Sequence, residues 1–260
     1  MNINLWEYTN MKKITLFTFL AVISMSTFAN PGRYQINQAC IDVGCFVGDD
    51  PNTVTIEITQ ASGTFVLTSD LVFDSSLNSV PAILVSRVDN DSAVTIDLNG
   101  YQMRLNGAAN SNTNGIDVIG EDSFVTIKNG KIVNFSDGVH AVDGVTLTIK
   151  DMVFQGNADD AVQMPLGSIR NSVFDGNNYS IFAVNNEDAF NGDRLIIESN
   201  QFFGVDQQVF SIGSSNLCKD NMVAYIGTNS NLGSCTLSGL NLCGSTPCAA
   251  NAINSNGQKE

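Results

Sequence analysis

Residues 124–150 read FVTIKNGKIVNFSDGVHAVDGVTLTIK and contain one short motif twice. The segment VTIK at 125–128 returns 22 positions later as LTIK at 147–150. Each copy alternates apolar and polar residues, which is the pattern of a strand with one buried face. Gly, Asn and Asp surround both copies, and these residue types favour tight bends. The sequence therefore predicts short strands joined through sharp corners.

The same strand pattern recurs along most of the chain. Steps of 31, 22, 20 and 28 residues separate the reference isoleucines Ile96, Ile127, Ile149, Ile169 and Ile197. The two long steps contain insertions at 108–113 and 185–193. A second strand recurs in the same rhythm, and its apolar positions are Ile116, Val139, Val162, Ile181 and Val209. A third, shorter strand follows each copy of the first, so a repeat of about 22 residues carries three strands.

Three such short strands cannot pair within one repeat, so each must pair with its counterpart in the next repeat. We therefore predict an all-β, single-domain, right-handed parallel β-helix over residues 54–229. A leucine-rich repeat has a similar period, but its LxxLxLxxN pattern is missing. A β-sandwich would not keep three strands in one fixed rhythm.

The ends of a solenoid expose open sheet edges and need caps. We expect an N-terminal cap at 30–53, a Cys-rich C-terminal cap at 230–250 and a flexible tail at 251–260. The six cysteines lie only near the two ends: Cys40, Cys45, Cys218, Cys235, Cys243 and Cys248. Six cysteines allow 15 pairings, and we expect the local one, in which neighbours in sequence are joined. A zinc site is the alternative, which the missing CxxC spacing disfavours.

Residues 1–29 have the features of a secretory signal peptide. A basic start at 11–13 precedes an apolar run at 14–28, and small residues precede a cleavage position before Asn30. Met11 is a candidate for the true start. An uncleaved anchor is the alternative, although the run is short for a bilayer span. We predict a secreted or periplasmic protein, with no integral membrane segment once the leader is removed.

The charge balance excludes one class of partner. The chain has 12 Lys and Arg against 26 Asp and Glu, a net charge of −14. Removing residues 1–29 takes away two lysines and one glutamate, so the mature net charge becomes −15. Because phosphate affinity comes from clustered Lys and Arg, we expect no binding to nucleic acid. The sequence does not define an oligomeric state.

At these motifs the chain resembles the pectate-lyase-type superfamily of right-handed β-helix repeat proteins. The resemblance covers about 54–225 and rests on VTIKNG at 125–130, DGVHAV at 137–142 and NSVFDGN at 171–177. It implies a secreted solenoid. Many members of that superfamily are polysaccharide lyases, glycosidases or epimerases, and others are non-catalytic surface proteins, so the fold alone does not choose a function.

Two outward rows are expected along the second strand, on rungs about 4.8 Å apart. One row comprises Asp117, His140, Gln163, Phe182 and Phe210, and the preceding row comprises Asn114, Asp137, Asp160, Tyr179 and Gln207. Aromatic faces stack on sugars, and carboxylates and amides bind their hydroxyls. We name Asp160, Gln163, Tyr179, Phe182 and Phe210 as candidate substrate-binding residues.

The single histidine lies within this strip. His140 is the candidate catalytic acid or base, and Asp117 and Asp137 are the carboxylates that would tune it. Asp137 and Asp160 are also the candidate ligands of a calcium ion, the one cofactor that the sequence suggests. The alternative is that these residues form a solvated polar row with no catalytic role.

Two enzyme classes compete for this strip. The chain has an Asp159-Asp160 pair like that of polygalacturonases, but Asn114 stands where that family has an aspartate, so its hydrolytic site is incomplete. A lyase of acidic polysaccharides needs a base and a neutraliser of charge. Lys128, Lys150 and Arg170 form one basic outward row on the first strand, which serves either to hold anionic groups or to keep the sheet soluble.

These observations favour a protein that binds a polysaccharide and, if it is an enzyme, cleaves it as a lyase or a glycoside hydrolase. The alternative is a non-catalytic surface or structural solenoid or an adhesion module.

Overall fold

The computed structural model describes residues 32–74, 79–86, 93–108, 113–120, 122–142, 144–183, 195–204, 210–211, 216–224, 235–243 and 245–248. The chain divides into two units, 1–33 and 34–260. The expected leader at 1–29 and the expected tail at 251–260 lie outside the described residues. The described residues of the second unit are all-β apart from one short helix, α2 (Cys40–Val43).

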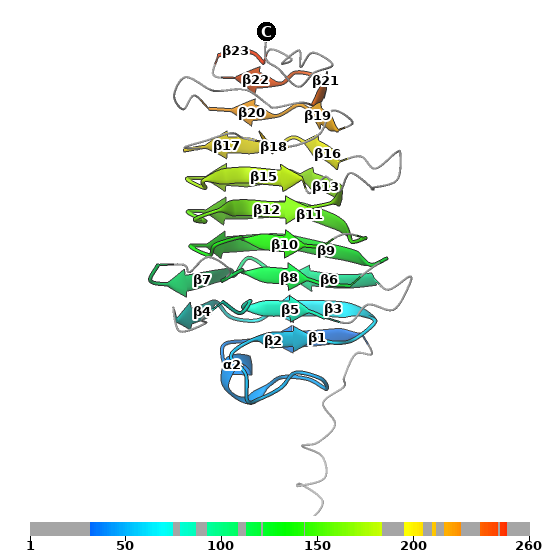
Figure 1. The fold of residues 1–260 in the computed structure, drawn as a ribbon, viewed down its shortest axis with the longest axis vertical. Coiled ribbons are helices and arrows are strands. Elements are labelled where there is room, and N and C mark those ends of the chain that lie inside the picture. Colours follow the sequence, from blue (N-terminus) through cyan, green and yellow to red (C-terminus); the bar gives the residue numbers. More distant parts are fainter. Residues whose placement is uncertain are drawn as a thin grey trace, which may run out of the picture. The chain divides into compact units, whose positions relative to one another are not determined.

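One parallel sheet is built from the second strand of each repeat (Figure 1). Its seven strands are β2 (Ile56–Ile58), β5 (Ile83–Val85), β8 (Ile116–Val118), β10 (Val139–Ala141), β12 (Asp160–Met164), β15 (Tyr179–Ala183) and β18 (Phe210–Ser211). In this sheet Ile116 pairs with Val139, Val139 with Val162, and Val162 with Ile181. The apolar positions of successive repeats are therefore in register, as the sequence predicts.

The other sheet has sixteen strands and combines the first and third strands of the repeats. The first-strand positions are β1 (Arg33–Ile36), β3 (Ser62–Leu67), β6 (Ala93–Asp97), β9 (Phe124–Val133), β11 (Thr146–Gln155), β13 (Leu166–Arg170), β16 (Leu195–Glu198), β19 (Leu217–Lys219) and β21 (Thr236–Ser238). The third-strand positions are β4 (Leu71–Asp74), β7 (Gln102–Asn106), β14 (Val173–Asp175), β17 (Gln201–Phe203), β20 (Met222–Val223), β22 (Leu242–Cys243) and β23 (Thr246–Pro247). In β9 and β11 both positions lie in one strand of ten residues.

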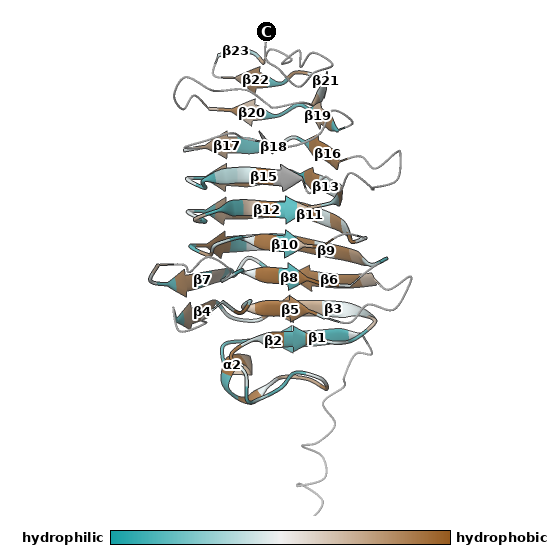
Figure 2. Ribbon diagram, in the orientation of Figure 1, coloured by the Kyte–Doolittle hydropathy of each residue, from teal (hydrophilic) through white to brown (hydrophobic). Residues whose placement is uncertain are grey.

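The recurring first strand keeps the predicted register. Ile96, Ile127, Ile149, Ile169 and Ile197 are paired from strand to strand and are fully buried. Figure 2 shows β5 brown along its whole length, since its three residues are Ile83, Leu84 and Val85. The pairing of β22 with β23 is antiparallel, unlike the parallel pairings described above.

The corner after the first strand has a positive φ in repeat after repeat. Asn129, Asp151 and Asn171 have φ values of 59°, 56° and 50°. Asparagine and aspartate tolerate this left-handed region better than other residues with a side chain. The bend lets β9 and β11 pass from the first to the third strand position without breaking the pairing between them.

Aromatic rings form a stack inside the third strand position. The ring centroids of Phe154 and Phe174 are 5.2 Å apart, and those of Phe174 and Phe202 are 4.8 Å apart. These three side chains are fully buried, whereas Val153 and Val173 are only partly buried. Strict alternation counted from the buried Ile149 would place Val153 inward, but the structure places Phe154 there instead. The positive-φ residue at the preceding corner shifts the alternation by one position.

Glycine at 138 is required where this stack meets the seven-stranded sheet. A Cβ at Gly138 would lie 2.5 Å from the carbonyl oxygen of Ala161 and 2.8 Å from the ring of Phe154. A side chain there would push the ring out of the core, and protein cores tolerate such overpacking poorly.

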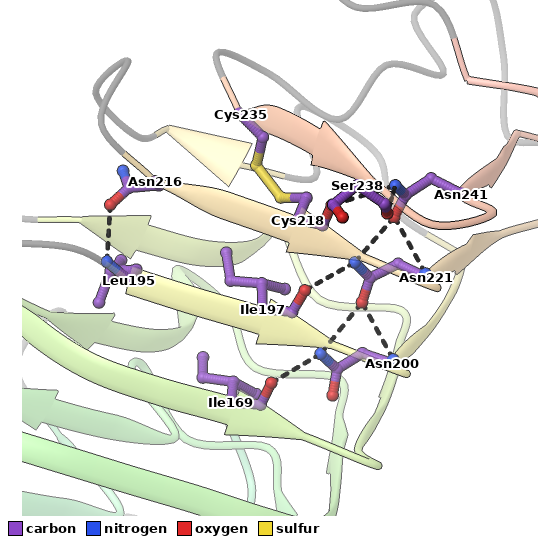
Figure 3. The surroundings of a disulfide bond; sticks show 10 residues. All are labelled: Ile169, Leu195, Ile197, Asn200, Asn216, Cys218, Asn221, Cys235, Ser238 and Asn241. Carbon is purple, nitrogen blue, oxygen red and sulfur yellow. Dashed lines mark hydrogen bonds between the residues drawn. A yellow bond between two sulfur atoms is a disulfide. The ribbon is translucent and has the colours of Figure 1, made fainter.

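Buried asparagines link the repeats near the C-terminal end (Figure 3). The backbone N–H of Asn200 donates to Oδ1 of Asn221 at 3.0 Å, and the N–H of Asn221 donates to Oδ1 of Asn241 at 3.0 Å. The Nδ2 of Asn221 donates to the carbonyl of Ile197 at 2.8 Å. This asparagine ladder satisfies backbone groups at corners where strand pairing ends.

Three disulfides join Cys40 to Cys45, Cys218 to Cys235, and Cys243 to Cys248. The predicted local pairing is confirmed, and the zinc alternative is therefore wrong. The first disulfide joins α2 to the loop after it, and the third lies beside the final β22–β23 pair. Disulfides stabilise segments that bury little apolar core, and they persist in oxidising, extracellular environments.

The described architecture is all-β, with two large and mostly parallel sheets stacked repeat on repeat. This arrangement is compatible with a parallel β-helix.

Candidate functional site

The candidate site lies on the partly exposed row of the seven-stranded sheet. Asp117, His140, Gln163 and Phe182 are paired in that order on β8, β10, β12 and β15. Glu57 and Leu84 continue the row on β2 and β5. The sequence predicted this row from Asp117 to Phe182, and the backbone register confirms it.

The predicted row is wrong at its last position. Phe210 pairs with Ile181, and Phe182 pairs with Ser211. Phe210 is therefore in register with a buried position and not with Phe182. The strand therefore lies one residue from its predicted place. The side chains of Phe182 and Phe210 lie outside the described parts of the structure.

His140 lies against a carboxylate of the neighbouring rung. Its Nδ1 is 3.4 Å from Oδ1 of Asp117, an ion-pair contact that lacks the geometry of a good hydrogen bond. The same Oδ1 accepts a hydrogen bond from Nδ2 of Asn114 at 2.8 Å. Side-chain exposure is 27 % for His140 and 17 % for Asp117. The imidazole is thus half-sheltered but reachable from outside the sheet.

The Asp117 contact raises the pKa of His140 above its ordinary value of 6.5, and it outweighs the opposing effect of burial. The more distant charges of Asp137 and Asp160 act in the same direction. His140 therefore retains a proton to higher pH than a free imidazole does. That behaviour suits a group that donates a proton to a ligand near neutral pH.

The second predicted row corrects the expectation that it points outward: Asn114 and Asp160 are buried, Asp137 and Tyr179 are partly buried, and Gln207 lies outside the described residues. The backbone N–H of Asp137 donates to Oδ1 of Asn114 at 3.4 Å, and the N–H of Asp160 donates to Oδ1 of Asp137 at 3.0 Å. Asn114 is 7 % exposed and Asp160 is 6 % exposed. The side chains of Asn114 and Asp137 turn toward the backbone of the next repeat, because N–H groups at the corner need acceptors.

Asp160 is the most perturbed acid of the site. Its Oδ1 is buried and has no hydrogen-bond partner among the described residues. Burial and the nearby carboxylates of Asp137 and Asp159 raise the pKa of Asp160 from 3.8 to about 7. Burial also raises the pKa of Asp137, although the N–H of Asp160 works against it. Close carboxylates resist ionising together, so this pair holds a proton near neutral pH.

The remaining predicted ligands of a substrate surround this cluster. Gln163 is partly buried and lies between His140 and Phe182 in the row. Tyr179 is partly buried and pairs with Asp160. The structure therefore brings Gln163 to the rung next to His140 and Tyr179 to the rung after it. The insertions at 108–113 and 185–193, which would form walls beside the row, lie mostly outside the described residues.

The calcium hypothesis finds no support from a ligand cluster. Among the described residues, no group of three or more His, Cys, Asp and Glu side chains has an arrangement that could hold a metal ion. One oxygen of Asp137 is occupied by the N–H of Asp160. Asp137 and Asp160 were predicted to bind calcium. Instead, Asp137 accepts a backbone hydrogen bond, and the raised pKa of Asp160 favours its protonated form.

The sequence analysis did not predict that Asn114 would hold Asp117, the carboxylate beside His140. The hydrogen bond from Asn114 to Asp117 spans three residues around the corner before β8. An Asn-x-x-Asp spacing at a predicted corner was the available signal. Because the amide fixes one carboxylate oxygen, Asp117 is held facing His140.

No family model, no curated protein and no solved structure matches the chain significantly. In the described part of the chain, no helix has the length and apolar character needed to cross a membrane.

Proposed function

We propose that this chain is a secreted or periplasmic right-handed parallel β-helix of the pectate-lyase type, and that it binds a polysaccharide along the seven-stranded sheet. Two large, mostly parallel sheets with in-register repeats support the β-helix. Three disulfides support export to an oxidising compartment. Carbohydrate binding rests on the chemistry of the exposed row.

The observation that carries the proposal is the His140–Asp117 contact in the middle of that row. The two residues and Gln163 occupy consecutive rungs about 4.8 Å apart. An extended sugar chain lying across the rungs would meet an imidazole, a carboxylate and an amide in succession. Groups of this kind bind hydroxyls by hydrogen bonds.

A cleavage reaction at this row would use His140 as its acid or base. The imidazole is partly exposed, whereas Asp160 is buried. Asp117 would hold the imidazole in place and stabilise its charged form. The charge that the Asp137–Asp160 pair retains would lie behind it, which favours a protonated imidazole. In a lyase or a hydrolase, such a group would move the proton at the broken bond.

A non-catalytic solenoid or adhesion module is the second candidate. It is favoured by the ladder through Asn114, Asp137 and Asp160, since their oxygens accept backbone hydrogen bonds or are buried. These residues then serve the fold, and the row would recognise sugars without cleaving them.

Cleavage and binding are separated by one set of assays on the oxidised mature chain. Neutral and acidic polysaccharides are offered, and we measure retardation in gels, new reducing ends and absorbance of unsaturated ends. The variants are His140→Ala and Asp117→Asn, and Asp74→Asn on strand β4 is the matched control. Cleavage lost in His140→Ala but kept in Asp74→Asn supports an enzyme. Binding without cleavage, weakened by the same variant, supports a recognition module. No retardation by any polysaccharide overturns the proposal.

A further inference from the structure

The sixteen-stranded sheet carries a row of charged side chains that the site on the other sheet does not use. Six positions are in register along this row: Asp97, Lys128, Lys150, Arg170, Glu198 and Lys219. Three consecutive rungs are cationic, although the whole chain has 12 basic and 26 acidic residues. On such an acidic protein, this is a local concentration of positive charge.

Ion pairs compensate the two ends of the cationic run. The Nζ of Lys128 is 3.2 Å from Oδ2 of Asp97, and Nε of Arg170 is 3.5 Å from Oε2 of Glu198. Glu198 also accepts a 2.6 Å hydrogen bond from Lys219, which holds the pKa of its carboxyl below the usual range. Arg170 therefore shares its acid with a second cation, and its charge is only partly balanced.

Lys150 occupies the middle rung and is exposed. No carboxylate lies within ion-pair distance of it in the described part of the chain, where the acids of this row stand at the two ends. Its neighbours in the row are Lys128 and Arg170, which repel it. The unbalanced charge of the row is thus centred on Lys150.

A row of hydroxyls runs beside the cations. Thr126, Thr148 and Ser168 are paired with one another and are partly exposed. Each lies two residues before a cation on the same strand, so both side chains project from the same face at a separation of about 7 Å. Three adjacent strands therefore present two donor types in a regular grid.

We infer that this cationic strip, made of Thr126, Lys128, Thr148, Lys150, Ser168 and Arg170, binds the sulfate esters of a sulfated polysaccharide. The inference depends on the proposed function only for the class of polymer, since the strip is on a different sheet from His140. A sulfate keeps its charge at all ordinary pH values. Its three free oxygens can accept hydrogen bonds from an ammonium group and a hydroxyl at the same time, whereas a carboxylate has only two oxygens.

Polymer geometry also favours sulfate over a uronic acid. Cations recur on every rung, about 4.8 Å apart. A polyuronate has one carboxylate for each sugar, and in an extended chain alternate carboxylates turn to opposite sides. Sulfate groups can occupy more than one position on each ring, so neighbouring rungs can each meet an anion.

The test compares a sulfated polymer with its unmodified backbone and with a polyuronate. We measure the affinity of the oxidised mature chain for dextran sulfate, unmodified dextran and polygalacturonate. The variant is Lys150→Gln, and Lys131→Gln is the control because it makes the same charge change at a third-strand position. Loss of one exposed charge contact at about 4 Å is expected to weaken dextran sulfate binding about fivefold. Lys131→Gln should change it less than twofold, and added salt should weaken binding by screening.

Equal effects of the two substitutions would overturn the cationic strip as the binding surface. Equal affinity for dextran would show that the sulfate is not recognised, and equal affinity for polygalacturonate would overturn the choice of sulfate over carboxylate. His140→Ala separates this inference from the proposed function. Dextran sulfate binding that survives His140→Ala but falls in Lys150→Gln supports the strip, whatever becomes of the neutral polysaccharides.

Discussion

Stability should fall as the pH rises, because the fold holds a proton at Asp160. Burial and nearby carboxylates keep the pKa of Asp160 at about 7 in the folded chain, against 3.8 ordinarily. The folded state therefore binds a proton that the unfolded chain releases. The resulting stability is fully present below about pH 4 and is lost as the pH rises to about 7.

The size of the effect follows from that difference in pKa. At 1.36 kcal/mol for each pH unit, the step from 3.8 to about 7 corresponds to at most about 4 kcal/mol. Asp160→Asn keeps the shape of the protonated carboxyl and removes its titration. We expect the variant to match the natural chain near pH 4 and to be more stable at pH 8.

Thermal unfolding from pH 4 to pH 8 measures this difference. One kcal/mol changes Tm by about 2–4 °C for a domain of this size, so Asp160→Asn should raise Tm at pH 8 by several degrees. Asp74→Asn, at an exposed position on β4, serves as the control and should leave the pH profile unchanged. A constant difference between Asp160→Asn and the natural chain at every pH would refute the reasoning.

Three further substitutions test the core, the ladder and the site. Phe174→Ala should reduce the free energy of unfolding by about 3–5 kcal/mol, because it empties the middle of the ring stack. Urea titrations measure this loss, and Phe203→Ala, at a partly exposed position, should reduce the free energy of unfolding by less. Asn221→Ala should reduce the free energy of unfolding by about 2–4 kcal/mol, since it leaves buried backbone groups unpaired. An unchanged urea midpoint would contradict the claim that the asparagine ladder stabilises the fold. Asp117→Asn should lower the pKa of His140, and an NMR titration in which this pKa stays constant would contradict the contact.

The repeat could be predicted because burial imposes it on every rung. Ile127 and Ile149 must both point inward, and a register error would expose one of them. The same register also predicts that Asp117 lies beside His140 in one row and that Lys128 lies beside Lys150 in another. Local cysteine pairing was predictable because each pair is close in sequence and lies at an end of the fold.

The failures share a physical cause at the corners. Alternation counts positions along an extended strand, but Asp151 has a positive φ and resets that count. As a result Phe154 points inward, where the pattern had placed Val153. Alternation also cannot tell that Asn114 and Asp137 turn their side chains to the backbone of the next repeat. Such side chains satisfy unpaired N–H groups, which a polarity pattern does not reveal.

The single histidine makes the central claim directly measurable. The chain contains one His, so the imidazole NMR signals of the untagged protein report on one residue, His140. We predict that a neutral polysaccharide fragment which binds the chain shifts these signals and changes the pKa of His140. Asp74→Asn should respond as the natural chain does, and Asp117→Asn should respond differently. Saturating binding of a neutral polysaccharide that leaves the imidazole signals and their titration unchanged would contradict a binding site on the seven-stranded sheet.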